Sequence, residues 1–342
     1  MEDPLKVMKV PESMASQLKE AATMIESTTG IIRVLSHYDG DGICSAAIIS
    51  KALYRAGKRF QTTMTEVLTT EDIDRMEGGF DLLLISDMGS LLAGRISEKI
   101  LDLGVRCIIL DHHKTNGREV PFSIADGRGI LEVNPRFHHI NGTTGCCGST
   151  LAFLLAEALS ADNLDLAVFS LSGAIADRQH VPEFTELNLG VKAFAVDLGL
   201  IETHVGMPLH GTTVVEALHM SNDPFIKGIS GHPDEAESLL SSISIDPQIP
   251  PEDLDHERSK VLQSLLYSHL LEAGVDFHRV HELFRENIIS TDWGDLQALA
   301  YEIDSCGRLG EEGTGFDTVW GGKEARLRAH ENRMRYKKNI QK

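Results

Sequence analysis

The sequence has no long apolar run, few cysteines and a shortage of positive charge. It contains no stretch of about 18 consecutive apolar residues, the length that a membrane-spanning helix needs, so no membrane contact is predicted. Its N-terminus, MEDPLKVMKVPES, lacks the apolar centre of a secretory signal peptide. The five cysteines, an odd number, lie mostly in apolar or glycine-rich stretches and are typical of reduced thiols. Together these absences predict a cytoplasmic protein.

Positive charge is both scarce and unevenly placed. The chain has 32 Lys and Arg against 51 Asp and Glu, a formal net charge of -19, which disfavours general attraction to nucleic acid. Bound divalent cations can reverse the sign of a local site, so nucleic-acid chemistry is not excluded. Residues 323–342 hold eight Lys or Arg and two Glu, a net of +6. This basic stretch indicates either a local contact with phosphate or an acidic partner, or a solvated terminal helix.

Short β-prone runs alternate with helical patterns over the first half of the 342 residues. The predicted strands are 31–35, 59–67, 81–86, 105–110 and 131–134. The predicted helices are 13–27, 42–56, 69–76, 93–103, 148–159 and 164–176. Strands separated by helices predict an α/β fold with a parallel sheet and right-handed crossovers. After about residue 184 the pattern changes to helices and loops with little β signal, so we expect two domains, residues 1–200 and a mainly helical region 201–342.

Acidic and imidazole residues follow four of the apolar runs. The run 106–110 leads into Asp111-His112-His113, the run 31–36 into His37-Tyr38-Asp39-Gly40-Asp41-Gly42, the run 81–86 into Asp87, and the run 171–176 into Asp177. The carboxyl ends of parallel strands share one edge of an open sheet, where ligands bind. Side chains far apart in the sequence can therefore converge at that edge, and this convergence predicts an enzyme.

The residue types at this predicted edge suit a divalent metal. Asp39 and Asp41 are two residues apart, so on extended backbone both carboxylates point the same way and repel each other unless a cation neutralises them. With Asp87, His112 and Asp177 they make a set of oxygen and nitrogen ligands that suits Mn²⁺, with Mg²⁺ or Zn²⁺ as alternatives. The sequence has no paired-cysteine set for structural zinc. Four carboxylates exceed what one ion requires, and two ions would use them fully.

Each of these signals alone has an ordinary explanation. An isolated Asp-x-Asp-Gly is typical of a surface turn, a single Asp after a strand is typical of a helix cap, and His138-His139 are typical of a solvated loop. These ordinary explanations do not readily account for all four signals occurring together, each at the end of a predicted strand or helix in an α/β pattern.

In their order along the chain, four motifs resemble those of the DHH phosphoesterase superfamily, and within it the archaeal RecJ-like nucleases related to Cdc45. The motifs are SHYDGDG at 36–42, SDMGS at 86–90, DHH at 111–113 and SGAIADRQH at 172–180. Residues 132–159 are similar to the family's Asn-Pro stretch and glycine-rich helix entry. Residues 206–231 and 299–310 resemble later segments of the archaeal proteins, so the resemblance covers most of residues 30–320.

The resemblance implies a parallel five-stranded sheet, flanked by helices, that holds a centre of two Mn²⁺ or Mg²⁺ ions. Asp39 and Asp41 would each face one ion, and Asp87 would bridge both and act in catalysis. His112 and Asp177 would complete the second ion.

The resemblance implies roles for further residues as well. His37 stands where some relatives place another ligand of the first ion. His113 would contact the scissile phosphate, as a catalytic and substrate-binding residue. Arg136 and the turn from Gly145 to Gly148 are further candidates for phosphate contact. Because consecutive side chains on extended backbone diverge, we expect His112 and His113 to serve different groups.

The function that the resemblance implies is metal-dependent phosphodiester hydrolysis of single-stranded DNA or RNA, by an exonuclease of DNA replication or repair. One alternative is hydrolysis of short oligonucleotides, cyclic dinucleotides or pyrophosphate at the same site. Another is a Cdc45-like scaffold bound to GINS, although every metal-ligand position is filled here. The Gly-Gly-Gly-His stretch of the substrate-gripping DHHA1 domain is not recognisable, so processive degradation is not expected.

Overall fold

A computed structural model of the chain describes residues 3–124, 129–222, 224–282 and 284–340. It divides into two compact units, Met1–Glu202 with Ser290–Arg333, and Thr203–Ile289 with Met334–Lys342. The sequence analysis expected one region from residue 201 to residue 342. In the structure, Ser290–Arg333 belong with the first unit instead, because the helices of this segment pack on helices of that unit.

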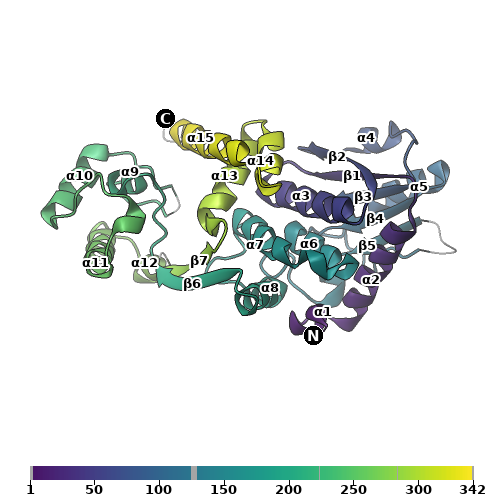
Figure 1. Cartoon of the computed structure of the whole chain (residues 1–342), viewed down its shortest axis with the longest axis horizontal. Coiled ribbons are helices and arrows are strands. Elements are labelled where there is room, and N and C mark those ends of the chain that lie inside the picture. The colour runs from purple at the N-terminus through teal and green to yellow at the C-terminus, as the bar shows by residue number, and fades with distance from the viewer. Residues whose placement is uncertain (1–2, 125–128, 223, 283, 341–342) are drawn as a thin grey trace. The chain divides into compact units, whose positions relative to one another are not determined.

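A five-stranded, fully parallel sheet forms the centre of the first unit, as predicted (Figure 1). Its strands are β1 (Ile31–His37), β2 (Arg59–Thr65), β3 (Leu82–Ser86), β4 (Arg106–Leu110) and β5 (Gly129–Val133), in the order β2-β1-β3-β4-β5. All residues of β3 and β5 are buried, and their sequences are apolar apart from Ser86, Gly129 and Glu132. Ser86 pairs with both Ser36 and Leu110, so β1, β3 and β4 end side by side. The residues that follow these strands are thereby brought to one edge of the sheet.

Helices cover both faces of this sheet. One face is covered by α3 (Gly40–Arg55) and α6 (Gly148–Leu159), with α2 (Glu12–Ser27) and α7 (Ala167–Ala176) packed against them. On the other face, α4 (Thr70–Asp74) and α5 (Ala93–Leu103) enclose an apolar cluster that includes Ile73, Ile85 and Ile100. The short helix α1 (Pro4–Val7) contacts α6, and α8 (Glu186–Asp197) contacts α7.

A second, three-stranded sheet was missed by the sequence analysis, which found little β signal after residue 184. Its strands are β6 (Ile201–Gly206), β7 (Arg285–Ser290) and β8 (Gly294–Asp295), in the order β6-β7-β8. Four of the six residues of β6 are exposed, so it lacks the apolar alternation by which a strand is recognised in a sequence. The described part of the second unit also contains the helices α9 (Val214–His219), α10 (Pro233–Ser242), α11 (His256–Glu272) and α12 (Phe277–Glu282).

Three further helices end the chain: α13 (Leu296–Arg308), α14 (Glu312–Val319) and α15 (Lys323–Ile340). Helix α13 packs against α3, α7 and α14, and its Leu299, Ile303 and Cys306 are fully buried. Most of the basic stretch 323–342 forms α15, and residues 341 and 342 lie outside the described part.

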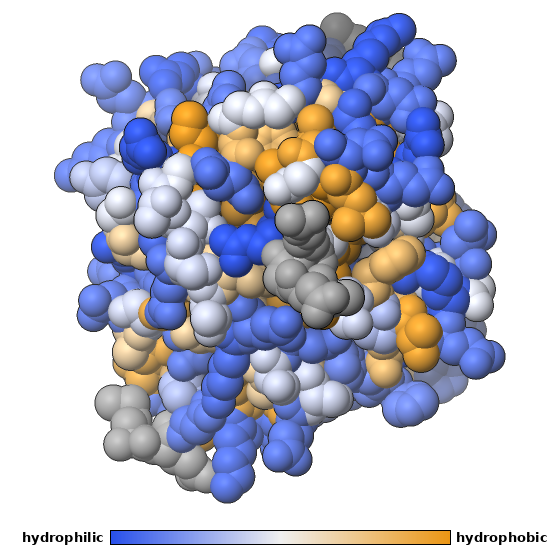
Figure 2. All heavy atoms as spheres, turned by 90° about the vertical axis from the view of Figure 1, so that its right-hand side faces the viewer, coloured by the Kyte–Doolittle hydropathy of each residue, from blue (hydrophilic) through white to orange (hydrophobic). Residues whose placement is uncertain are grey.

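The face of the first unit in Figure 2 is mainly hydrophilic, with apolar side chains gathered in smaller patches. No described helix combines the length and apolarity that crossing a membrane requires. All five cysteines are buried, and none of them is joined to another by a disulfide.

Because α13 contributes to the core of the first unit, we predict that Leu299→Ala lowers the free energy of unfolding by about 2–5 kcal/mol. The measurement is chemical denaturation followed by circular dichroism. Leu101→Ala is the matched control, because Leu101 is 56% exposed on α5 and its truncation should change stability by no more than about 0.5 kcal/mol. Equal effects of the two substitutions would show that α13 does not stabilise this unit.

Candidate metal centre

The first motif forms the turn between β1 and α3. Asp39 is the N-cap of α3, and its Oδ1 accepts a hydrogen bond of 3.0 Å from the backbone N–H of Gly42. A side chain at Gly42 would overlap the carbonyl of His37, so only glycine fits this turn. Asp41 lies in the first turn of α3, not on the extended backbone that the sequence analysis assumed. The tight start of the helix, rather than alternation along a strand, places both carboxylates at the sheet edge.

Asp41 is buried against the N-terminus of α6. Its carboxylate accepts hydrogen bonds from the backbone N–H groups of Gly148 at 2.7 Å and Ser149 at 2.9 Å, where the helix dipole favours negative charge. A Cβ on Gly148 would lie 2.6 Å from Cβ of Asp87. The Gly145 N–H donates to the carbonyl of Asn141. In this structure the N–H groups of both predicted phosphate-contacting glycines therefore bind protein acceptors, and their contact with substrate stays a prediction.

Asp87 lies between the other candidate ligands. It follows β3 directly, has a left-handed φ of 58°, and donates its N–H to the carbonyl of Leu110 at 2.8 Å. Its Oδ1 lies 3.1 Å from Nε2 of His112, and its Oδ2 lies 3.7 Å from Nδ1 of His37. The two oxygens of this one carboxylate, which is 2% exposed, therefore face two different groups of donors.

The structure brings all six predicted metal ligands together. One group consists of His37, Asp39 and Asp87, another of Asp41, His112 and Asp177, and a third of Asp87, His112 and His113; within each group the donor atoms lie within 4.8 Å of one another. The His37 Nδ1 lies 3.0 Å from Oδ2 of Asp39. The His112 Nε2 lies 3.8 Å from Oδ2 of Asp41 and 3.9 Å from Oδ2 of Asp177.

The charges in this cluster favour a cation. Burial, followed by repulsion from neighbouring carboxylates, raises the pKa of Asp87 well above its usual range. Burial and the nearby Asp41 likewise raise the pKa of Asp177 to about 6. The buried Nδ1 of His37 makes no hydrogen bond, although Oδ2 of Asp39 lies close to it. This is the arrangement expected when both atoms point at one metal position. Mixed oxygen and nitrogen donors in this arrangement fit a divalent metal ion.

The tautomer of His112 suits a ligand. Its Nδ1 lies against the carbonyl of Gly142, which can only accept, so Nδ1 carries a proton and Nε2 is the nitrogen that would bind a metal. Arg136 supports the same loop, because its Nε donates to the carbonyl of His112 at 2.9 Å and its guanidinium also binds the Thr143 hydroxyl at 3.0 Å. The observed contacts of Arg136 are thus with the loop, and its contact with phosphate stays a prediction.

His113 is held by Asp111. The Asp111 carboxylate accepts from Nδ1 of His113 at 2.8 Å and from the N–H of Ser90 at 2.8 Å. Burial would raise the pKa of Asp111, but the bond and charge of His113 outweigh it and lower that pKa to about 2. The side chains of His112 and His113 do not diverge as expected, and their ring centroids are 4.3 Å apart. The reason is that β4 ends at Leu110, so these residues are not on a strand, and Asp111 turns the second ring back.

Several supporting residues were not singled out in the sequence. The Gln179 amide donates to Oδ2 of Asp177 at 2.7 Å, and the Asn134 amide donates to the carbonyl of His113 at 3.0 Å. Both positions carry a readable signal, since Gln179 lies two residues after Asp177 and Asn134 follows β5 directly. Asp304 of α13 accepts from the N–H of Gly40 at 3.0 Å. No local signal could have shown this last contact, which joins residues 264 positions apart.

Comparison with known proteins agrees with this geometry. Residues 31–176 match the family described as "DHH family, N-terminal domain". An uncharacterized protein of Methanocaldococcus jannaschii is 27% identical over 330 residues, which are 89% of this chain and 71% of that protein.

Two solved structures are similar in fold. The exonuclease RecJ bound to manganese has a TM-score of 0.50 and 19% identity, and covers 93% of this chain. This chain spans 66% of that RecJ chain, less than two thirds of it. CDC45 from Entamoeba histolytica has a TM-score of 0.65 and 13% identity, with 99% of this chain and 72% of that chain covered. The part of the chain that matches the DHH family, residues 31–176, contains five of the six candidate metal ligands, and Asp177 follows it directly.

The raised pKa of Asp177 predicts a pH dependence of stability in chelator-treated protein. The pKa of Asp177 is about 6 in the folded protein, against an ordinary value of 3.8. Its contribution to the free energy of unfolding is therefore complete below pH 3.8 and is lost as the pH rises through 6. Asp177→Asn should therefore reduce the loss of stability between these pH values. The measurement is the melting temperature against pH in EDTA, with the exposed Asp317→Asn as control. The same loss in both variants would contradict the assigned environment of Asp177.

Proposed function

We propose that this chain, whose residues 31–176 form a domain of the DHH family, hydrolyses phosphodiester bonds of single-stranded nucleic acid with the help of two divalent cations, Mn²⁺ or Mg²⁺. The observation that carries the proposal is the position of Asp87, whose two carboxylate oxygens face two separate donor groups. The similarity in fold to an exonuclease bound to manganese supports an exonuclease in particular.

The side chains divide naturally between two ions. His37 and Asp39, with Oδ2 of Asp87, would hold one ion. Asp41, His112 and Asp177, with Oδ1 of Asp87, would hold the other. When bound, such ions stabilise negative charge on phosphoryl oxygens and lower the pKa of a water that can attack phosphorus.

His113 is the candidate for direct contact with the substrate. The charged Asp111 carboxylate can only accept, so Nδ1 of His113 carries the proton and the ring is fixed in one orientation. The side chain is 54% exposed, so Nε2 is accessible, and in the doubly protonated ring it would carry a second proton that it can donate to a phosphate oxygen. Gln179 and Asn134 act through other groups, since they position Asp177 and the backbone of His113.

Two alternative functions follow from specific features. The same site could act on short oligonucleotides or cyclic dinucleotides, because both present the same phosphodiester. The similarity in fold to CDC45 over 99% of this chain, with a net charge of -19, favours a protein partner of the GINS type. A protein that served only as a scaffold would not need a complete set of metal donors. Hydrolysis is therefore the function that the site supports best.

The direct experiment uses single-stranded DNA and RNA labelled at either end, incubated with Mn²⁺ beside cyclic dinucleotide and pyrophosphate. Asp87→Asn should lower the rate of cleavage at least about 100-fold and remove bound Mn²⁺, since both ions lose a shared ligand. The control is Asp102→Asn, an exposed position on α5. Hydrolysis of pyrophosphate without cleavage of any strand would contradict the proposed substrate.

The two adjacent histidines should separate binding of metal from turnover. We predict that His112→Ala lowers the Mn²⁺ content measured by atomic emission, whereas His113→Ala keeps the metal and slows cleavage about 10²–10⁴-fold. His204→Ala, at an exposed position of β6, is the control. If both substitutions removed metal equally, His113 would be a ligand and not a substrate contact.

A further inference from the structure

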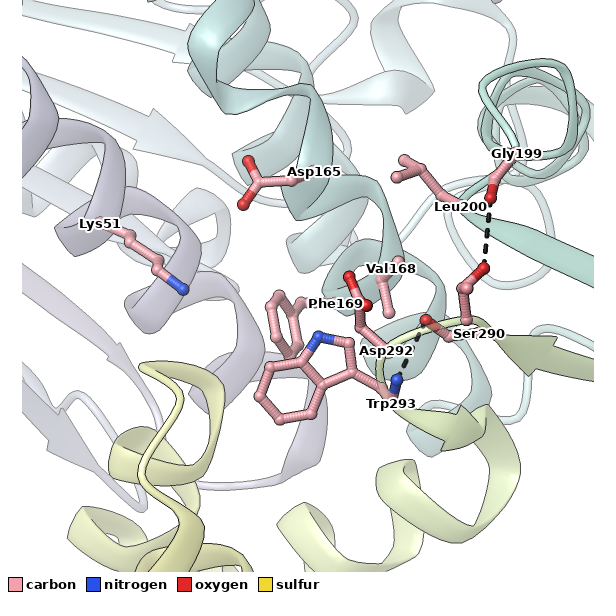
Figure 3. Close-up of a pocket in the computed structure, with 10 residues that line it drawn as sticks. Lys51, Asp165, Val168, Phe169, Gly199, Leu200, Ser290, Asp292 and Trp293 are labelled. Atoms are coloured by element: carbon pink, nitrogen blue, oxygen red, sulfur yellow. Dashed lines mark hydrogen bonds between the residues drawn. The ribbon is translucent and has the colours of Figure 1, made fainter.

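The first unit contains a cavity of about 260 Å³ (Figure 3). It lies between α3, α7 and residues 290–293, and none of the candidate metal ligands lines it. Lys51 on its wall follows Asp41 by ten residues of α3, which is roughly 15 Å along the helix axis at about 1.5 Å per residue. The cavity is therefore separate from the metal centre.

One wall of the cavity is aromatic and well fixed. The rings of Phe169 and Trp293 meet edge to face, with centroids 4.9 Å apart and planes at 70°. Arg326 donates to the carbonyl of Trp293 at 2.7 Å, and its guanidinium lies 5.7 Å from the indole centroid. Trp293 is partly exposed, so part of its surface is available. A held indole at the edge of a cavity suits a flat heteroaromatic ligand.

The polar groups around the cavity include donors and acceptors. Lys51 is half-buried, and burial lowers its pKa; its Nζ donates to the carbonyl of Val319 at 3.2 Å and keeps further donor capacity. The Asp165 carboxylate is occupied by Arg55, with two bonds of 2.7 and 2.8 Å. Asp292 is exposed and has no ion-pair partner among the described residues. Two carboxylates beside the cavity disfavour a phosphate and favour a ligand with N–H donors.

We propose that this cavity binds a purine base, with guanine preferred over other bases. Guanine presents O6 and N7 as acceptors for Lys51, and its exocyclic amine is a donor for Asp292. The indole of Trp293 supplies the surface for the ring. Binding of a base in this cavity needs no metal and no bond cleavage, so the proposal goes beyond the proposed hydrolysis. Only the choice of nucleosides as probes rests on the proposed function.

The chain has two tryptophans, so Trp320→Phe leaves Trp293 as the single indole reporter. The test titrates this variant with guanosine, inosine and cytidine in EDTA, in an Asp87→Asn background that removes the metal centre. Guanosine should quench the fluorescence of Trp293 saturably. Inosine, which lacks the exocyclic amine, should bind about tenfold more weakly, as expected for one hydrogen bond to a charged group.

Matched variants test the two recognition contacts. Asp292→Asn should abolish the difference between guanosine and inosine, and Lys51→Gln should weaken both. In a protein that keeps Trp320 and carries Trp293→Phe, guanosine should leave the fluorescence unchanged. Circular dichroism of each variant shows that it is folded.

Three results would overturn the proposal. They are no saturable quenching by any nucleoside, equal binding of guanosine and inosine, or a preference for guanosine that survives Asp292→Asn. None of these results depends on hydrolysis, so failure here leaves the proposed function untouched, and a protein without hydrolytic activity could still bind guanosine.

Discussion

The structure around the sheet edge depends on one electrostatic constraint, the burial of Asp87 among other carboxylates. Burial and repulsion together raise its pKa well above the usual range, so without a cation the charged form is strongly disfavoured. A protein that needed only a stable fold would gain by replacing such a residue. A buried acid in a left-handed backbone conformation is typical of a functional site, where the surrounding structure holds the residue in place.

The elements around Asp87 act as supports for this cluster. The N-terminus of α6 stabilises the Asp41 carboxylate through two backbone N–H groups. From the far end of the sequence, Asp304 of α13 binds the N–H of Gly40 and so holds the start of α3. Asp111 and Gln179 orient His113 and Asp177 in turn. The donor groups are therefore pre-arranged by rigid elements, which lowers the cost of ordering them when ions bind.

Much of this architecture could be predicted because its causes are local. The buried strands are apolar runs, and an acidic or imidazole residue stands at or just after the end of β1, β3 and β4. A parallel sheet with the candidate ligands at one edge could therefore be predicted from the residues, whereas its five strands were implied by the family resemblance. The short sheet of β6, β7 and β8 could not be predicted, because β6 is mostly exposed and pairs with a strand far away in sequence. The packing of α13 on the first unit was also missed, because α13 contacts α3 and α7, which lie far from it in the sequence. The turning of His113 toward His112 depends on a side-chain bond to Asp111 that no periodicity encodes.

The central claim is that one carboxylate joins two metal sites. Crystals of the protein grown with Mn²⁺ and measured by anomalous diffraction at the manganese edge test it most directly. The account predicts two anomalous peaks on either side of Asp87, one beside His37 and Asp39 and the other beside Asp41 and His112. A single peak, or two peaks of which only one lies within bonding distance of Asp87, would contradict it.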